Sequence, residues 1–414
     1  MYFIYIITSY IFVIISPLVI IYRIAIGKEN KVRFQERYAI PTAYRNKGKL
    51  IWFHCSSVGE LISIIPLLEK LELNKNINQI LITTTTLSSS KIFTNFNFKK
   101  TVHQFFPIDN NFIVKKFLDH WKPSCLFLCE SEIWPNMINA IHRRKIKLIL
   151  LNARLTNKSF KRWRKLKHFS TNLFRKFDMC FPQNHETSKR LKILGVKNIL
   201  NLGNLKFSTS KKVEKDFLKK KYLGFFRNKK ILITAASTHH NEEDFVIKSH
   251  LYFKKKFKNI VSIIIPRHVE RSREISKELE KLSFKFHLHS STKKIDPKID
   301  FYIVDTYGET NKFYKISNIV FMGGSLIPHG GQNPLEAAKL GCKIIHGPNV
   351  YNFKEIYEKL NKMKISTNFY TYKNGIKIIN KELNTRKFSL KNNRIINYGQ
   401  KVLKLTYTEL IEFI

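Results

Sequence analysis

Short apolar runs alternate with helical patterns along most of this 414-residue chain, and this alternation restricts its fold more than any other feature. Strand–helix–strand units of this kind build parallel sheets. The strand candidates are Leu50–Phe53, Gln79–Thr84, His103–Phe106, Ser124–Cys129, Lys147–Leu151 and Asp178–Phe181, then Lys230–Ala235, Asn259–Ile265, Phe284–His289, Asp300–Val304, Ile319–Met322 and Lys343–His346. The sequence therefore predicts an α/β protein, and its length suits two domains.

A lysine-rich stretch, Lys206–Lys230, separates the two sets of strands, and we place the hinge near its start. We expect one domain at 23–207 and another at 208–414, with terminal helices that pack back on the first. Ligands of open parallel sheets bind beyond the carboxyl ends of the strands. A cleft between the domains is therefore expected, and each motif that follows a strand is a candidate for the site.

The segment Met1–Tyr22 has no charged residue. A bilayer core takes roughly 20 apolar residues, so the segment is long enough to span one. Basic residues follow the segment directly: Arg23, Lys28, Lys31 and Arg33. The positive-inside rule places such residues in the cytoplasm. A cleaved signal peptide is disfavoured, because it would carry positive charge before the apolar stretch and a small-residue cleavage site after it, and neither is present. We expect a membrane anchor that spans the bilayer or, with Pro17 allowing a kink, lies against its surface.

The formal charge of +44, from 74 Lys+Arg against 30 Asp+Glu, favours polyanionic partners such as nucleic acid, anionic lipid or phosphorylated substrates. The abundance of Lys, Asn, Ile and Phe is also what A+T-rich codon usage produces, in which case the charge is a solvated surface. The cysteines are scattered and include no CxxC pair, so they predict neither a disulfide framework nor a zinc site. They are Cys55, Cys125, Cys129, Cys180 and Cys342.

The first polar motif follows the first strand candidate and reads His54-Cys55-Ser56-Ser57-Val58-Gly59-Glu60. It leads into an apolar helical face, so Glu60 lies at or near a helix N-terminus. An acidic residue there can merely complement the helix dipole. A carboxylate at the mouth of a cleft can also take a proton from a hydroxyl that attacks a sugar.

The second motif, Glu130-Ser131-Glu132-Ile133-Trp134-Pro135-Asn136, comes directly after the apolar run Cys125–Cys129. Its two carboxylates are either solvated loop charges or, beside Glu60, groups that orient a donor hydroxyl or stabilise positive charge at an anomeric carbon. Arg154 and Lys206 each close a further apolar segment. They are either surface cations or partners of a sugar carboxylate or phosphate.

In the second half, Pro266-Arg267-His268 follows one strand candidate and Ser237-Thr238-His239-His240-Asn241-Glu242-Glu243 follows another. The histidines lack the ligand spacing of a known metal motif, so no metal site is predicted. After a third strand candidate, Ile319–Met322, come two glycine-rich segments: Gly323-Gly324-Ser325 and Gly330-Gly331-Gln332-Asn333-Pro334-Leu335-Glu336. Glycines there permit close approach to a phosphate, and Pro334 fits the first position of a helix. Asn333 and Glu336 are either a capping box or nucleotide contacts.

In this order, the motifs from about His54 to Leu360 resemble those of bacterial 3-deoxy-D-manno-oct-2-ulosonic acid (Kdo) transferases. The resemblance implies a GT-B glycosyltransferase: an N-terminal anchor helix and two Rossmann-like domains facing a central cleft, the first for the acceptor and the second for CMP-Kdo. It implies Kdo transfer to the lipid A precursor (lipid IVA) in lipopolysaccharide core biosynthesis. The reaction would be inverting and metal-independent, without a cofactor or nucleic-acid partner, on the cytoplasmic side of the inner membrane.

The same resemblance assigns roles to residues. Glu60 would be the general base, and Glu130 and Lys206 would stabilise the transition state. The positions that match the family's cytidine nucleotide site are Arg267, His268, Tyr307, Gly308, Glu309, Asn333, Pro334, Leu335 and Glu336.

The chain departs from the family pattern in two motifs. Gln332 stands where the family shows His in Gly-Gly-His-Asn-Pro, and His240 and Asn241 replace Glu and Gly in Ser-Thr-His-Glu-Gly-Glu-Glu. Gln332 can donate and accept hydrogen bonds but carries no charge, which puts a proton-relay role there in doubt. Two other functions are open: a GT-B nucleotide-sugar epimerase, which gives no reason for an anchor, and a non-catalytic polyanion-binding protein, whose binding would fall steeply with salt.

Overall fold

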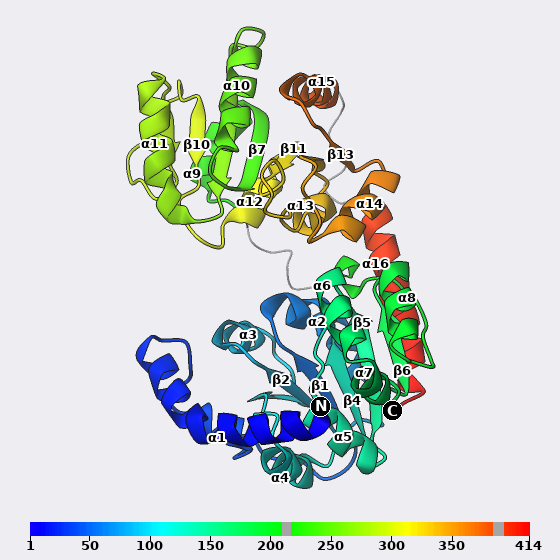
Figure 1. Ribbon diagram of the computed structural model, residues 1–414. Helices are drawn as coiled ribbons and strands as arrows, with labels where there is room; N and C mark the ends of the chain where they lie inside the picture. The colour runs from blue at the N-terminus through cyan, green and yellow to red at the C-terminus, as the bar shows by residue number, and fades with distance from the viewer. Residues whose placement is uncertain (209–216, 384–392) are drawn as a thin grey trace. The chain divides into compact units, whose positions relative to one another are not determined.

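The computed structural model describes residues 1–208, 217–383 and 393–414, and these fold as two compact units. The first unit contains 1–208 and 398–414, and the second contains 217–383 and 393–397. Each is built on one parallel sheet (Figure 1). Part of the Lys206–Lys230 stretch expected to hold the hinge, residues 209–216, lies outside the described residues.

The sheet of the first unit has the strand order β3-β2-β1-β4-β5-β6, which is the doubly wound Rossmann order. Its strands are β1 (Leu50–Cys55), β2 (Gln79–Thr84), β3 (Thr101–Phe105), β4 (Cys125–Cys129), β5 (Lys147–Ala153) and β6 (Met179–Pro182). The helices are α1 (Tyr2–Ala25), α2 (Val58–Leu71), α3 (Leu87–Phe93), α4 (Asn111–Trp121), α5 (Pro135–Arg143), α6 (Asn157–Lys165), α7 (Lys167–Phe174) and α8 (His185–Ile193), with 3-10 turns η1 (Phe34–Tyr38) and η2 (Leu205–Phe207). Because β1 and β4 are neighbours, the chain order reverses between them, and the loops after these strands flank the crevice.

Both faces of this sheet are covered, which is why its strands are nearly continuous apolar runs. Leu50 and Trp52 point into a core that includes residues of α4 and α5. Ile51 and Phe53 point to the other side, where they pack with α2 and with the end of α16 (Asn393–Ile411).

The second unit has the order β13-β12-β11-β7-β8-β10-β9, again parallel, with β7 between β11 and β8. Its strands are β7 (Lys230–Thr238), β8 (Ile260–Pro266), β9 (Phe286–Leu288), β10 (Phe301–Ile303), β11 (Ile319–Met322), β12 (Lys343–His346) and β13 (Ser366–Asn368). Its helices are α9 (Lys220–Arg227), α10 (Glu243–Lys254), α11 (Ser272–Lys281), α12 (Thr310–Tyr314), α13 (Leu335–Lys339), α14 (Lys354–Lys362) and α15 (Tyr372–Leu383), with the 3-10 turn η4 (Val269–Arg271). The order reverses between β7 and β11; the polar motif 237–243 begins within the end of β7, and the motif 323–336 follows β11.

Every strand candidate from the sequence corresponds to a strand of the structure, with ends that differ by at most three residues. The largest difference is in β7, which continues to Thr238 through an irregularity at Ser237, whose φ is +56°. Two residues of the 237–243 motif therefore belong to the strand itself. The strand β13 was missed because a three-residue Ser-Thr-Asn segment carries no apolar pattern.

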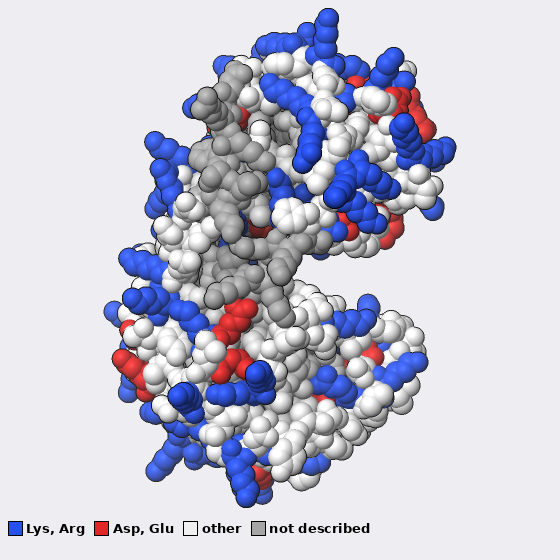
Figure 2. Space-filling view, turned by 180° about the vertical axis from the view of Figure 1, so that it is seen from behind, with Lys and Arg blue, Asp and Glu red and all other residues white. Residues whose placement is uncertain are grey.

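Figure 2 shows how basic side chains are distributed on one face of the molecule. On the face drawn in Figure 2, Lys and Arg side chains are scattered among other residues instead of forming one continuous patch. On this face, the distribution matches a solvated surface better than a dedicated polyanion-binding surface.

Candidate active site

Glu60 lies at the start of α2, where the chain leaves the central strand β1. Ser57 is the N-cap of this helix, and the Glu60 carboxylate accepts hydrogen bonds from Ser56 N at 2.7 Å and from Ser57 Oγ at 3.0 Å. The side chain therefore forms a capping box at the N-terminus of α2. This geometry agrees with the interpretation of Glu60 as a residue that stabilises the start of the helix. The capping contacts leave the carboxylate able to accept further hydrogen bonds or a proton, because it has about four lone-pair sites.

The environment of Glu60 is unusual for a capping residue, since the residue is only 8% exposed. Burial, with the negative charges of Glu130 and Glu132 nearby, raises the pKa of Glu60 to about 7. A carboxyl of this pKa exchanges its proton near neutral pH. It is the behaviour expected of a general base, and a solvated first-turn Glu would not show it.

Glu130 is held in a strained and buried position after β4. Its φ is +54°, a left-handed conformation that is uncommon for residues with a side chain. The carboxylate is paired with Lys206 Nζ at 2.5 Å. Lys206 is positioned in turn by η2, whose backbone is tied to the end of β5 by a hydrogen bond from Leu205 N to Asn152 Oδ1 at 3.1 Å. The motifs at 130, 152 and 206 thus form one assembly.

Glu132 belongs to a second network beside Glu60. Its carboxylate accepts from Trp134 Nε1 at 2.8 Å and lies 3.2 Å from His54 Nε2. His54 is fully buried, its ring is stacked on Phe106, and its Nδ1 is 3.0 Å from Thr83 Oγ1. No role was predicted for His54. Its signal was a polar side chain at the end of an otherwise apolar strand.

In the second unit, Glu242 organises the glycine-rich loop after β11. Its fully buried carboxylate accepts from the backbone N–H groups of Gly324, Ser325 and Leu326 at 2.6–2.9 Å, and from His239 N at 3.0 Å. These loop donors are thus occupied within the protein. At Gly323 a glycine is also required by packing within the protein, because a side chain there would collide with the backbone of Ser237.

Several positions of the predicted nucleotide site gather at this edge of the second sheet. Arg267 and His268 are exposed directly after β8, and the His268 ring lies 6.4 Å from that of His239. Gln332 Nε2 is 3.3 Å from His239 Nε2. Burial and neighbouring cationic side chains lower the pKa of His239 to about 4, so the imidazole is neutral at pH 7.

The remaining predicted positions are less tightly connected. Tyr307 is exposed and donates to Glu270 at 3.4 Å, Gly308 has φ +83°, and Glu309 pairs with Lys312 at 3.0 Å. This places the 307–309 loop beside the turn that follows His268.

The start of the helix near residues 333–336 differs from the sequence-based prediction. Pro334 is the N-cap of α13, which begins at Leu335, so Pro334 is not the first helical residue. Asn333 is not the N-cap either; its Oδ1 accepts from Leu335 N at 3.1 Å, and no capping box with Glu336 forms. The helix starts later because Asn333 makes its own turn with the backbone two residues on. Glu336 is exposed as a residue, and its carboxyl forms a hydrogen bond with the side chain of Asn311.

The structure explains one departure from the family pattern. Asn241 has φ +70°, a left-handed conformation that Gly adopts freely and Asn tolerates better than other residues. Asn241 therefore replaces the family's Gly with little strain. Among the described residues, no three His, Cys, Asp or Glu side chains are grouped so that they could hold a metal ion.

Comparison with known proteins decides the family. Residues 32–209 match the family model described as 3-deoxy-D-manno-octulosonic-acid transferase (kdotransferase). The 3-deoxy-D-manno-octulosonic acid transferase of Rickettsia bellii is 34% identical over 342 residues, which cover 83% of this chain and 81% of the relative. The chain belongs to the Kdo transferase family. The transferase of the same name from Haemophilus influenzae is 31% identical over 75% of this chain and 73% of its own length.

Solved structures identify the fold of this glycosyltransferase as GT-B. UDP-N-acetylglucosamine 2-epimerase from Rickettsia bellii has a TM-score of 0.52 at 12% identity, and covers 88% of this chain and 96% of its own. HepE from Anabaena in complex with UDP has a TM-score of 0.53 at 11% identity, with 88% and 98% covered. At such identities the likeness concerns the fold alone, so it lends no support to an epimerase activity.

Proposed function

We propose that this transferase moves Kdo from CMP-Kdo to a hydroxyl of the lipid A precursor, lipid IVA, with inversion at the anomeric carbon and without a metal. The observation that carries the proposal is Glu60: a buried carboxyl at the switch point of the first sheet, with a pKa of about 7. The acceptor oxygen attacks the anomeric carbon while Glu60 takes its proton. The bond from that carbon to the CMP phosphate oxygen breaks, and CMP leaves with the electron pair.

The proposed roles of the other residues follow from their charges. The Glu130–Lys206 pair lies close enough to Glu60 for Glu130 to affect its titration, and it stabilises charge that develops during transfer. In the second unit, Arg267 and His268 are exposed polar groups that fit the phosphate of CMP. The loops at 307–309 and 333–336 complete the proposed nucleotide site.

The proposed location is the cytoplasmic face of the inner membrane. It is supported by α1, which is long and apolar enough to cross a membrane, and by the basic residues after it. An amphiphilic acceptor with phosphate groups would be met at the same surface.

The test is mass spectrometry of lipid products after incubation of the purified protein with CMP-Kdo and tetra-acylated lipid A precursor. A mass gain of one or more Kdo units is expected for wild type. A wild-type protein that hydrolyses or epimerises nucleotide sugar without acceptor, and never modifies the lipid, would overturn the proposal.

The pH profile tests the role of Glu60 as base. Because only the ionised carboxylate accepts a proton, kcat/KM should rise by about tenfold per pH unit below pH 7 and level off above it. Glu132→Gln removes a negative charge that raises the pKa of Glu60, so this variant should move the rising limb to lower pH. Exposed Glu280→Gln is the control and should leave the limb in place. A profile flat from pH 5 to about pH 9 would exclude a titrating base.

Glu242→Gln should weaken the second unit at its proposed nucleotide site. One amide oxygen cannot replace a carboxylate that accepts from four backbone N–H groups, so we expect a loss of ~2–4 kcal/mol in stability and weaker CMP binding. Thermal unfolding and calorimetric titration with CMP measure both, again with Glu280→Gln as control. Wild-type CMP affinity in Glu242→Gln would show that the loop does not depend on this clamp.

A further inference from the structure

The side of α1 that faces the first unit is its polar side. Tyr5 Oη donates to Asp109 Oδ2 at 2.8 Å, and Asn110 Nδ2 donates to Ser9 Oγ at 3.3 Å. Figure 1 shows α1 running along the outside of the first unit, near α4. The helix is therefore held through specific polar contacts, which a helix surrounded by lipid would not need.

The contacts continue along most of the helix. Ser16 Oγ lies 2.9 Å from Tyr38 Oη, and Tyr2 at the N-terminal end is stacked on Phe169 of α7. The docked positions are Tyr2, Tyr5, Ser9, Val13, Ser16 and Ile20, which repeat every three or four residues and so form one helical stripe. We call this set the docked stripe.

The contact with Asp109 is built into the fold. Asp109 is buried, and its carboxylate also accepts from Asn136 N at 3.0 Å and Met137 N at 2.7 Å at the start of α5. If α1 left the first unit to cross a bilayer, Asp109 would lose the Tyr5 hydroxyl. That phenol would also enter hydrocarbon without a partner, which is costly.

The opposite side of α1 is an uninterrupted apolar surface. Its residues, each at least 45% exposed, are Phe3, Ile7, Ile11, Ile14, Leu18 and Ile21. They also repeat every three or four residues, and we call them the exposed stripe. A soluble surface rarely leaves such a stripe in water, so a partner covers it.

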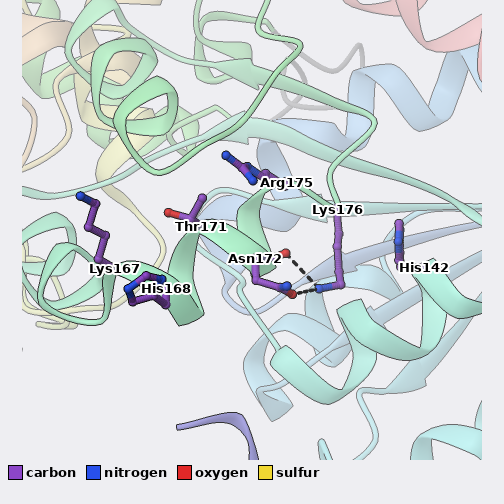
Figure 3. A pocket seen from close by; sticks show the side chains of 7 residues that line it. All are labelled: His142, Lys167, His168, Thr171, Asn172, Arg175 and Lys176. Atoms are coloured by element: carbon purple, nitrogen blue, oxygen red, sulfur yellow. Dashed lines mark hydrogen bonds between the residues drawn. The ribbon is translucent and has the colours of Figure 1, made fainter.

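Charges at both ends of α1 favour an anionic lipid surface as that partner. Arg23, Lys28 and Lys31 lie at or just beyond the C-terminal end. At the N-terminal end, Tyr2 packs on α7, which together with α5 lines an open pocket of about 540 Å³ (Figure 3). The nitrogen-bearing side chains in this pocket are His142, Lys167, His168, Arg175 and Lys176, besides Asn172. Basic groups at both ends suit a helix that lies along a membrane, where both ends meet lipid headgroups.

We propose that α1 lies in the plane of the membrane surface, attached to the first unit by its docked stripe, with its exposed stripe inserted at the boundary between headgroups and acyl chains. Both ends of α1 then remain on the cytoplasmic side. The proposal rests on the proposed location at the inner membrane, but it replaces a spanning anchor with a monotopic one.

Cysteine labelling separates the two topologies. The native cysteines are all buried, so an added one can be labelled selectively. One variant carries Cys-Gly-Ser ahead of Met1, and the other is Lys28→Cys at an exposed position beyond the helix. In spheroplasts with a membrane-impermeant maleimide, both should react only after the inner membrane is permeabilised. Reaction of the N-terminal cysteine in intact spheroplasts overturns the proposal. Kdo transfer is measured in the same cells, so a failure of the topology and a failure of the proposed function are distinguishable.

The exposed stripe has its own test with the full chain and vesicles of phosphatidylethanolamine and phosphatidylglycerol. Ile14→Glu, at a position 78% exposed, should lower vesicle binding by roughly tenfold or more, because it places a charge where lipid is expected. Leu73→Glu is the matched control, at a position 81% exposed outside α1, and should bind as wild type does. Vesicle binding by Ile14→Glu at the wild-type level overturns the proposal. The proposal is also overturned if the wild-type protein does not bind vesicles but forms a dimer that the Ile14→Glu substitution dissociates.

Discussion

Glu60→Gln is expected to lower the turnover of Kdo transfer by ~10²–10⁴-fold, the usual contribution of a general base. The substitution keeps the shape of the side chain. Its amide oxygen can still accept from Ser56 N, and the amide nitrogen can donate to Ser57 Oγ, so the capping box persists. The loss should therefore appear in kcat, with CMP affinity unchanged.

The same variant should be more stable than wild type above neutral pH. A carboxyl whose pKa rises from 4.5 to about 7 on folding favours the folded state while it is protonated, and this contribution is lost as pH rises through 7. Gln stays neutral, so thermal unfolding at pH 8 should show Glu60→Gln gaining stability, by up to ~3 kcal/mol for a shift of this size.

A control variant in the same helix makes this prediction specific. Glu69→Gln, in the same helix α2 but outside the candidate site, should leave the turnover of Kdo transfer unchanged. Glu60→Gln with full activity would remove Glu60 from the mechanism. An inactive variant that is less stable at pH 8 would instead point to a structural role for the carboxylate.

The fold was largely predictable because strands covered on both faces are continuous apolar runs, as in Cys125–Cys129. The same reasoning placed Glu60 and Glu130 directly after strands, at the edge where ligands bind, and the structure shows that these two strands are neighbours. It gave the location of the candidate site without giving its geometry.

Contacts between residues far apart in the sequence could not be predicted. The Glu242 carboxylate holds backbone groups more than 80 residues away, and Tyr5 reaches Asp109 across 104 positions. Composition and spacing also gave no sign that Glu130 adopts a left-handed conformation. Such features depend on tertiary packing, which also determines whether an apolar helix leaves the protein or lies on it.

Lys206→Met should destabilise the first unit by ~3–5 kcal/mol and abolish most Kdo transfer, because it leaves the carboxylate of Glu130 buried without its cation. The two side chains are mostly shielded from water, so solvent does not compensate for the lost pair. Thermal or urea unfolding measures the first effect, and the lipid mass-spectrometry assay measures the second. Lys147→Met breaks an exposed Lys–Asp pair in the same unit and should cost less than about 1 kcal/mol.

The double variant Lys206→Met with Glu130→Gln separates stability from catalysis. With both charges removed, no buried charge remains unpaired, and most of the lost stability should return. Activity should not return, since the proposed transition-state contacts are absent. If the double variant regained both, the pair would be a structural element of the fold, and charge stabilisation during Kdo transfer would have to come from other residues. If Lys206→Met alone kept both stability and activity, the buried ion pair would have neither role.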